Sequence, residues 1–194
     1  MDLTQGTKQD KNSRAKKMML YFGIGALVMS FAGWTSAFIV SSSRPDWLQD
    51  FVMPTPFWTS IVIMLISSVT FIIARKALEK NNKNLTTIML VVTFVLGLFF
   101  VFNQFKGFSQ IIEMGYNFTG PTSNVTVSYI YLIAVVHILH VAAGLIPILI
   151  VIINHLRGKY TPNNYLGFEL AEIFWHFVDI LWLYLFFFLY FFLN

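Results

Sequence analysis

Four ionisable residues near the end of the sequence, Glu169, Glu172, His176 and Asp179, follow one another at intervals of three, four and three residues. This spacing places them on one face of an α-helix. Carboxylate and imidazole groups can exchange protons, bind metals or form buried ion pairs, and inside a membrane each costs a few kcal/mol unless it has a partner or a role. The stripe therefore supplies the first candidate functional residues.

A second pair of ionisable residues, His137 and His140, lies three residues apart in the preceding apolar segment. A short connection joins the two segments, so we expect neighbouring antiparallel helices. The histidines of one helix would then face the carboxylates of the other. The sequence suggests a buried polar cluster centred on His140, His176 and Asp179, with Asp179 about 15 Å into the membrane if its helix enters near Glu169.

Histidine is also the usual ligand of haem and of several metals, so redox chemistry is the alternative for these residues. Two stacked haems do not fit, because residues three apart rise only about 4.5 Å along a helix. A single haem between His140 and His176 remains geometrically possible, as does a mixed histidine and carboxylate metal site. Hydrogen-bonded structural histidines are the favoured interpretation, because intramembrane polar residues commonly hold helices together.

Other polar residues inside apolar segments are Asn103, Gln104, Ser67 and Ser68. We interpret them as groups that hydrogen-bond between helices rather than as an ion path. The sequence contains no cysteine, which excludes disulfides, thiolate metal sites and thiol nucleophiles. It also contains no phosphate-binding loop and no dinucleotide fingerprint.

The composition indicates a membrane protein that positions these residues within apolar helices. Of the 194 residues, 57% are hydrophobic and only 11% are charged, which is outside the range of a soluble domain. The net charge of +4 comes from basic residues at the N-terminus and in the connections between apolar runs. Membrane orientation explains this charge, and we expect no nucleic-acid partner.

Five apolar runs are each long enough to cross a hydrocarbon core of about 30 Å. We predict an all-α, polytopic membrane protein with a basic tail at 1–17 and one transmembrane domain at 18–194. The predicted spans are about 18–40, 57–74, 85–105, 125–153 and 170–193.

The basic residues predict the orientation of these spans. Eleven lysines and arginines fall before the first span and in the connections after the second and fourth spans, whereas Arg44 and Lys106 are the two on the other side. By the positive-inside rule, the N-terminus is cytoplasmic and the C-terminus lies outside.

Several segments together resemble the cytochrome c oxidase subunit III family. The C-terminal stretch GFE at 167–169, followed by WHFVDILWL at 175–183, is similar to the signature of that family. The segment HILHV at 137–141, with Gly144, resembles its preceding motif, and SSVT at 67–70 its second-span pattern in the short bacterial form. Phe31-Ala32-Gly33 and Gln104 also fall where the family would have them.

Two residues depart from the pattern of the family. Leu27 stands where the family usually has a buried glutamate, and Gly107 stands where the third helix would carry an acid. The resemblance therefore implies a divergent branch, and a relative associated with quinol oxidase or nitric oxide reductase stays open. Lipid or proton-related roles of those two acids are not carried over to this chain.

The resemblance implies an accessory subunit without redox centres in a proton-translocating terminal oxidase of the bacterial inner membrane. Such a subunit packs directly on subunit I, near subunit II and other respiratory subunits, which carry the haem and copper. It holds phospholipid and supports proton uptake and stable turnover. Four histidines are too few for the ligands of subunit I, and the lack of cysteine excludes the dicopper site of subunit II.

We therefore expect no catalytic, cofactor-binding or metal-binding residue in this chain. The candidate residues for buried polar contacts, lipid contacts or a subunit interface are His137, His140, Glu169, Glu172, Trp175, His176, Asp179, Trp182 and Gln104. A haem b-binding membrane anchor and a small transporter are the competing hypotheses, although the sequence shows no internal repeat typical of transporters.

Overall fold

The computed structural model describes residues 7–48, 51–120, 123–162 and 164–193 of the chain. The helices are α1 (Lys8–Ser41), α2 (Thr55–Glu79), α3 (Lys83–Glu113), α4 (Val125–Leu156) and α5 (Leu166–Leu193). Each helix is long and apolar enough to cross a membrane. The prediction of an all-α, multi-pass membrane protein with five transmembrane helices is confirmed. Residues 1–6 of the predicted tail and the C-terminal Asn194 lie outside the described residues.

Each predicted span lies inside one observed helix, and all five helices extend beyond their spans at one or both ends. The basic segment before the first span forms the first turns of α1. This helix begins early because Thr7 and Asp10 form a capping box, in which each side chain bonds the backbone amide of the other residue. Asn82 and Asn124 cap α3 and α4 because their side chains accept from the backbone amides of Leu85 and Thr126, and Pro54 and Pro56 lie at the start of α2.

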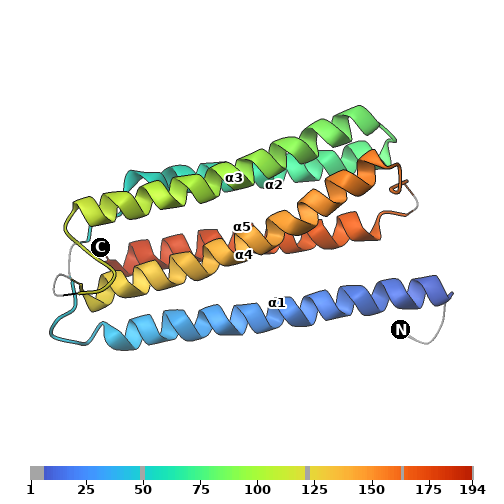
Figure 1. Ribbon diagram of the computed structural model, residues 1–194. Helices are drawn as coiled ribbons and strands as arrows, with labels where there is room; N and C mark the ends of the chain where they lie inside the picture. Colours follow the sequence, from blue (N-terminus) through green and yellow to red (C-terminus); the bar gives the residue numbers. More distant parts are fainter. Residues whose placement is uncertain (1–6, 49–50, 121–122, 163, 194) are drawn as a thin grey trace.

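The five helices run alternately up and down along a common direction (Figure 1). We call the end where α1, α3 and α5 begin the basic end, because it carries Lys17, Arg75, Lys76 and Lys83. In Figure 1, α2 and α3 lie on one side, α4 and α5 lie in the middle, and α1 lies on the other side. The α2–α3 pair makes the most extensive contact, while α1 makes smaller contacts with α4 and α5.

Trp175 of α5 forms the centre of the packing between α3, α4 and α5. Its indole ring lies against Gly97 of α3 and Gly144 of α4, where an added Cβ would stand 2.7 Å and 3.2 Å from ring atoms. Small residues let membrane helices approach closely when no water is available to drive their association. The two glycines therefore set the space that this large side chain occupies.

Gly107 of α3 shows how the chain accommodates one departure from the family pattern. A Cβ at this position would lie 2.8 Å from the ring of Phe57 in α2, which is buried. The aromatic ring fills the space that a carboxylate side chain would need. An acid at this position would therefore require Phe57 to move.

Candidate functional site

The ionisable stripe of α5 faces α2 rather than α4. Glu172 and Asp179 are buried, with 4% and 3% of their surface exposed, and His176 lies between them on the same helical face. On α2, Ser68 and Arg75 meet this face. We refer to Ser68, Arg75, Glu172, His176 and Asp179 together as the polar column.

The inner part of the polar column is a hydrogen-bonded set of three side chains. Ser68 donates its hydroxyl proton to Oδ2 of Asp179, and its Oγ lies 3.0 Å from Nδ1 of His176. Because the hydroxyl proton is directed to the carboxylate, the serine oxygen accepts from His176, which places the imidazole proton on Nδ1. The other ring nitrogen, Nε2, is then left with a lone pair.

The outer part of the polar column contains a charged pair at the basic end. Arg75 Nη1 lies 3.1 Å from Glu172 Oε2, and Arg75 Nε lies 3.1 Å from Glu79 Oε1. The second oxygen of Glu172 is 3.8 Å from Nε2 of His176. A pocket of about 470 Å³ lies beside this pair, lined by Ile72, Arg75, Lys76, Glu79, Glu172, Ile173 and His176. Charged side chains therefore reach from the basic end to Glu172, and Glu172 lies next to the imidazole of His176.

Glu169, the first residue of the predicted stripe, belongs to a different contact. It lies in the first turn of α5 and pairs with Lys17 of α1, with 2.6 Å between Nζ and Oε1. Both side chains are partly exposed. The pair connects α1 with α5 at the basic end, and a partly exposed pair of this kind contributes about 0–1 kcal/mol.

Trp175 and Trp182 hold the neighbouring face of α5 against a row of serines on α2. The indole Nε1 of Trp175 donates to Ser67 Oγ at 2.8 Å, and that of Trp182 donates to Ser60 Oγ at 3.0 Å. Both tryptophans are buried. The interhelical role predicted for Ser67 and Ser68 is confirmed, and so is that of Asn103, which donates to Pro56 O and Thr59 Oγ1 at 2.6 Å.

His137 and Gln104 are also buried, but within the described residues neither has a hydrogen-bond partner for its side chain. The His137 ring is stacked on Trp182, with centroids 5.0 Å apart, and meets Phe100 edge-on at 5.9 Å. The imidazole is thus packed as an aromatic ring. The prediction that Gln104 hydrogen-bonds between helices is wrong for the described residues, because neither its amide nitrogen nor its amide oxygen has a partner there.

The hypothesis of one cluster centred on His140, His176 and Asp179 is wrong in its first member. His140 is partly exposed, its Nδ1 lies 2.7 Å from the backbone oxygen of Val136, and its ring meets Phe31 of α1. Its neighbour His137 points inward instead, since residues three apart differ by about 60° around the helix. His140 and His176 therefore point towards different helices.

The directions of His140 and His176 argue against a haem bound between them. A haem between His140 and His176 would need both imidazoles on one side of the α4–α5 pair, whereas one faces α1 and the other faces α2. In the described ranges, no group of three or more His, Asp or Glu side chains is arranged to hold a metal ion.

Sequence reasoning missed Ser60 and Arg75 as partners of the α5 face. Arg75 stands seven residues after Ser68, and Ser60 stands eight residues before it, so all three fall on one face of α2. That periodicity was available in the sequence. These two residues were not recognised because serine is common in membrane helices and because Arg75 lies in the basic segment that connects the second and third apolar runs.

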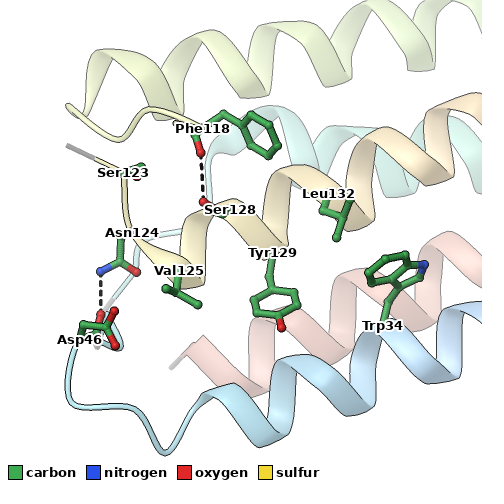
Figure 2. A pocket seen from close by; sticks show the side chains of 9 residues that line it. All are labelled: Trp34, Asp46, Phe118, Ser123, Asn124, Val125, Ser128, Tyr129 and Leu132. Carbon is green, nitrogen blue, oxygen red and sulfur yellow. Dashed lines mark hydrogen bonds between the residues drawn. The ribbon is translucent and has the colours of Figure 1, made fainter. Parts of the chain in front are cut away.

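A second pocket, of about 460 Å³, lies at the end opposite the basic end (Figure 2). Trp34 of α1 and Tyr129 and Leu132 of α4 form its apolar wall. At its rim Asn124 donates to the backbone oxygen of Asp46, and Ser128 donates to that of Phe118 (Figure 2). Arg44 lies 2.8 Å from Asp46 and lowers the pKa of that carboxyl group through their hydrogen bond. No sequence motif identified this pocket, because its walls come from distant segments.

The profile of the family "Cytochrome c oxidase subunit III" matches residues 48–194, which include α2 to α5. A cytochrome c oxidase subunit 3 of Papio hamadryas is 28% identical over 95% of this chain and 74% of its own length. One of Spodoptera frugiperda is 32% identical over 64% of this chain and 81% of its own. A probable cytochrome c oxidase subunit 3 of Rickettsia prowazekii is 36% identical over 70% of this chain and 47% of its own.

Proposed function

This chain belongs to the cytochrome c oxidase subunit III family, and we propose that it is the accessory subunit of a proton-translocating terminal oxidase. It is thus part of a multi-subunit complex, in which it packs directly on subunit I, near subunit II and other respiratory subunits. The family match over four of the five transmembrane helices carries this proposal. The haem and copper of the complex belong to the partner subunits.

The main test of the accessory role is removal of this subunit from the complex. We expect the haem spectra and the initial rate of oxygen reduction to stay nearly unchanged. Activity should then decline during sustained turnover, because proton uptake is no longer supported. A complex that turns over stably without the subunit, or that loses a haem band with it, contradicts the accessory role.

Phospholipid binding is a further part of this proposal, and the crevice between α1 and α5 supports it. The crevice has a volume of about 240 Å³ and is lined almost entirely by apolar side chains: Val28, Phe31, Ala32, Phe177, Ile180, Leu181 and Tyr184. Such a surface suits an acyl chain. Ala32→Trp should fill the crevice and reduce the phospholipid that remains in the purified complex, as measured by mass spectrometry. Unchanged lipid content in a correctly assembled variant argues against this site.

We also propose the bacterial inner membrane as the location, with the N-terminus cytoplasmic and the C-terminus outside. The clustering of eleven of the thirteen basic residues at one end supports this orientation. The chain has no cysteine, so a single introduced cysteine is the one thiol of this chain that a reagent can label, and its labelling shows on which side of the membrane it lies. A membrane-impermeant thiol reagent applied from outside should label Gly120→Cys and spare Asn84→Cys, and the reverse pattern contradicts the orientation.

A further inference from the structure

The polar column connects the pocket at the basic end with a carboxyl group deep in the helical bundle. Its outermost group beside the pocket is the Arg75–Glu172 pair, and its innermost group is Asp179. Between them stand His176 and Ser68, whose side chains can both donate and accept hydrogen bonds. Neighbouring groups that can donate and accept are able to pass a proton from one to the next.

His176 is the group of the inner set that reaches the pocket. Its side chain is 26% exposed, and its ring contributes to the pocket wall. Nε2 has no hydrogen-bond partner in the part of the chain that the structure describes. With the proton on Nδ1, Nε2 presents a lone pair. This nitrogen is buried, and the carboxylate oxygen Oε1 of Glu172, which lines the pocket, lies 3.8 Å from it.

Asp179 is the group at which the path ends. It is buried, Ser68 bonds its Oδ2, and its Oδ1 has no hydrogen-bond partner among the described residues. The ion pairs found within those residues do not include Asp179. A buried carboxylate needs compensation by a cation or by several hydrogen bonds. A proton delivered through Ser68 is the compensation that this arrangement can supply.

From these observations we propose that His176 and Ser68 relay protons between the basic-end pocket and Asp179, which is thereby a proton-exchanging site inside the membrane. The inference rests on the proposed function, because it gives one route by which this subunit takes part in proton uptake. The ligand of the site is the proton itself.

The transfer balances without another reactant. A hydronium ion in the pocket gives a proton to the Glu172 carboxylate, which passes it to Nε2 of His176 and is a carboxylate again. The Nδ1 proton then passes to Ser68 Oγ. The original hydroxyl proton of Ser68 passes to Oδ2 of Asp179. Water and Asp179 end neutral, the hydroxyl group is intact, and the imidazole has changed tautomer. The same steps in reverse return the proton to the pocket and restore the first tautomer.

The charges around the relay come from three helices. Arg75, Lys76 and Glu79 of α2 and Glu172 of α5 line the pocket, and Lys17 of α1 neutralises Glu169 one turn earlier. Glu172 lies closest to His176, with 3.8 Å between Oε1 and Nε2, so it stabilises the imidazolium that forms during transfer. Arg75 holds Glu172 in this position.

The test uses the purified complex that contains this subunit and measures the infrared carbonyl stretch of protonated carboxyl groups. A band that disappears in Asp179→Asn identifies the Asp179 carboxyl group. On transfer from H₂O to D₂O, this band should shift at a rate that reports proton exchange. We expect Ser68→Ala and His176→Gln to slow the shift by about tenfold or more, since general acid–base groups typically contribute at least that much.

Ser67→Ala is the matched control, because it removes a hydroxyl from the adjacent position that serves Trp175 and not Asp179. Its exchange rate should equal that of the unmodified complex, and Ser68→Thr, which keeps the hydroxyl, should exchange faster than Ser68→Ala. Unchanged haem bands and subunit content show that each variant has assembled. Equal rates in Ser68→Ala and Ser67→Ala, or no band that depends on Asp179, overturn the relay.

The two proposals fail in different ways. If removal of the whole subunit slows sustained turnover but Asp179 does not exchange through Ser68, the accessory role stands and the relay is wrong. If Asp179 exchanges as expected but removal of the subunit has no effect on turnover, the relay stands as a property of the chain and its role in proton uptake is wrong.

Discussion

Histidine has opposite surroundings in two regions: the polar column, and a buried aromatic site formed by His137, Trp182 and Phe100. In the column, His176 hydrogen-bonds Ser68 on a neighbouring helix and reaches a pocket. In the aromatic site, His137 stacks on Trp182, and neither ring nitrogen has a partner in the described ranges. Both histidines have a second polar residue three positions later. Spacing alone therefore does not distinguish a hydrogen-bonded histidine from one that is packed as a ring.

The difference arises from the residues on the helices opposite. Facing His176 and Asp179, α2 presents Ser68, whose short side chain brings a hydroxyl group between them. Facing His137, α1 and α3 present Phe31 and Phe100, which offer ring edges and no acceptor. A polar side chain in a membrane helix becomes part of a network only where the next helix carries a matching group.

Trp182 connects the two regions, so its truncation should have the largest effect. Its ring stacks on His137, and its Nε1 donates to Ser60 on the face of α2 that carries the column. We expect Trp182→Ala to lower the free energy of unfolding in mixed micelles by about 3–5 kcal/mol, as for other large buried aromatic residues. Trp58→Ala is the control, because Trp58 is 42% exposed. Equal losses in both variants would show that Trp182 is not central to either region.

Breaking the polar column at Asp179 should have the next largest effect. Asp179→Leu leaves the hydroxyl of Ser68 without its acceptor, which we expect to cost about 2–3 kcal/mol, and the subunit should be lost from the complex on heating. Asp179→Asn keeps the shape and an acceptor oxygen, so it should cost about 1 kcal/mol. Subunit retention after a thermal ramp measures both variants. If Asp179→Leu is retained as well as the unmodified chain, the column is not a structural element.

The aromatic site should tolerate removal of its polar atoms. His137→Phe and Gln104→Met put apolar side chains of similar shape and somewhat larger volume in place of groups that have no hydrogen-bond partner in the described part of the chain, so we expect changes within about 1.5 kcal/mol. Asn103→Leu is the matched control on α3, because Asn103 donates to Pro56 and Thr59. This control should cost about 1–3 kcal/mol. A larger loss in Gln104→Met than in Asn103→Leu would reverse the comparison.

The smallest effect is expected at Glu169, which belongs to the stripe by spacing but lies outside the column. Glu169→Gln removes the ion pair with Lys17, which is partly exposed, and should cost at most about 1 kcal/mol. The loss should diminish in high salt, since salt screens exposed charges. Unfolding in mixed micelles at low and high ionic strength provides the measurement. A loss comparable with that of Asp179→Leu would mean that the whole stripe acts as one network.

The sequence by itself determined the five helices, their alternating directions and the common face of Glu172, His176 and Asp179. Hydropathy and helical periodicity depend on residues close together in the chain, so they can be read without knowledge of the partners. The resemblance to the family also came from short contiguous motifs, which the family match over 48–194 bears out.

Only the tertiary structure decided which helix meets that face. Asp179 is bonded by Ser68 of α2, 111 residues earlier in the chain. The helix nearest in sequence, α4, instead packs its Gly144 against Phe174 and Trp175 on another face of α5. The choice depends on how side-chain volumes fit, as at Gly97 and Gly144 around the indole of Trp175. Such packing is the sum of many weak contacts between distant segments of the chain. A rotation of about 60° around α4 separates the inward-facing His137 from the outward-facing His140.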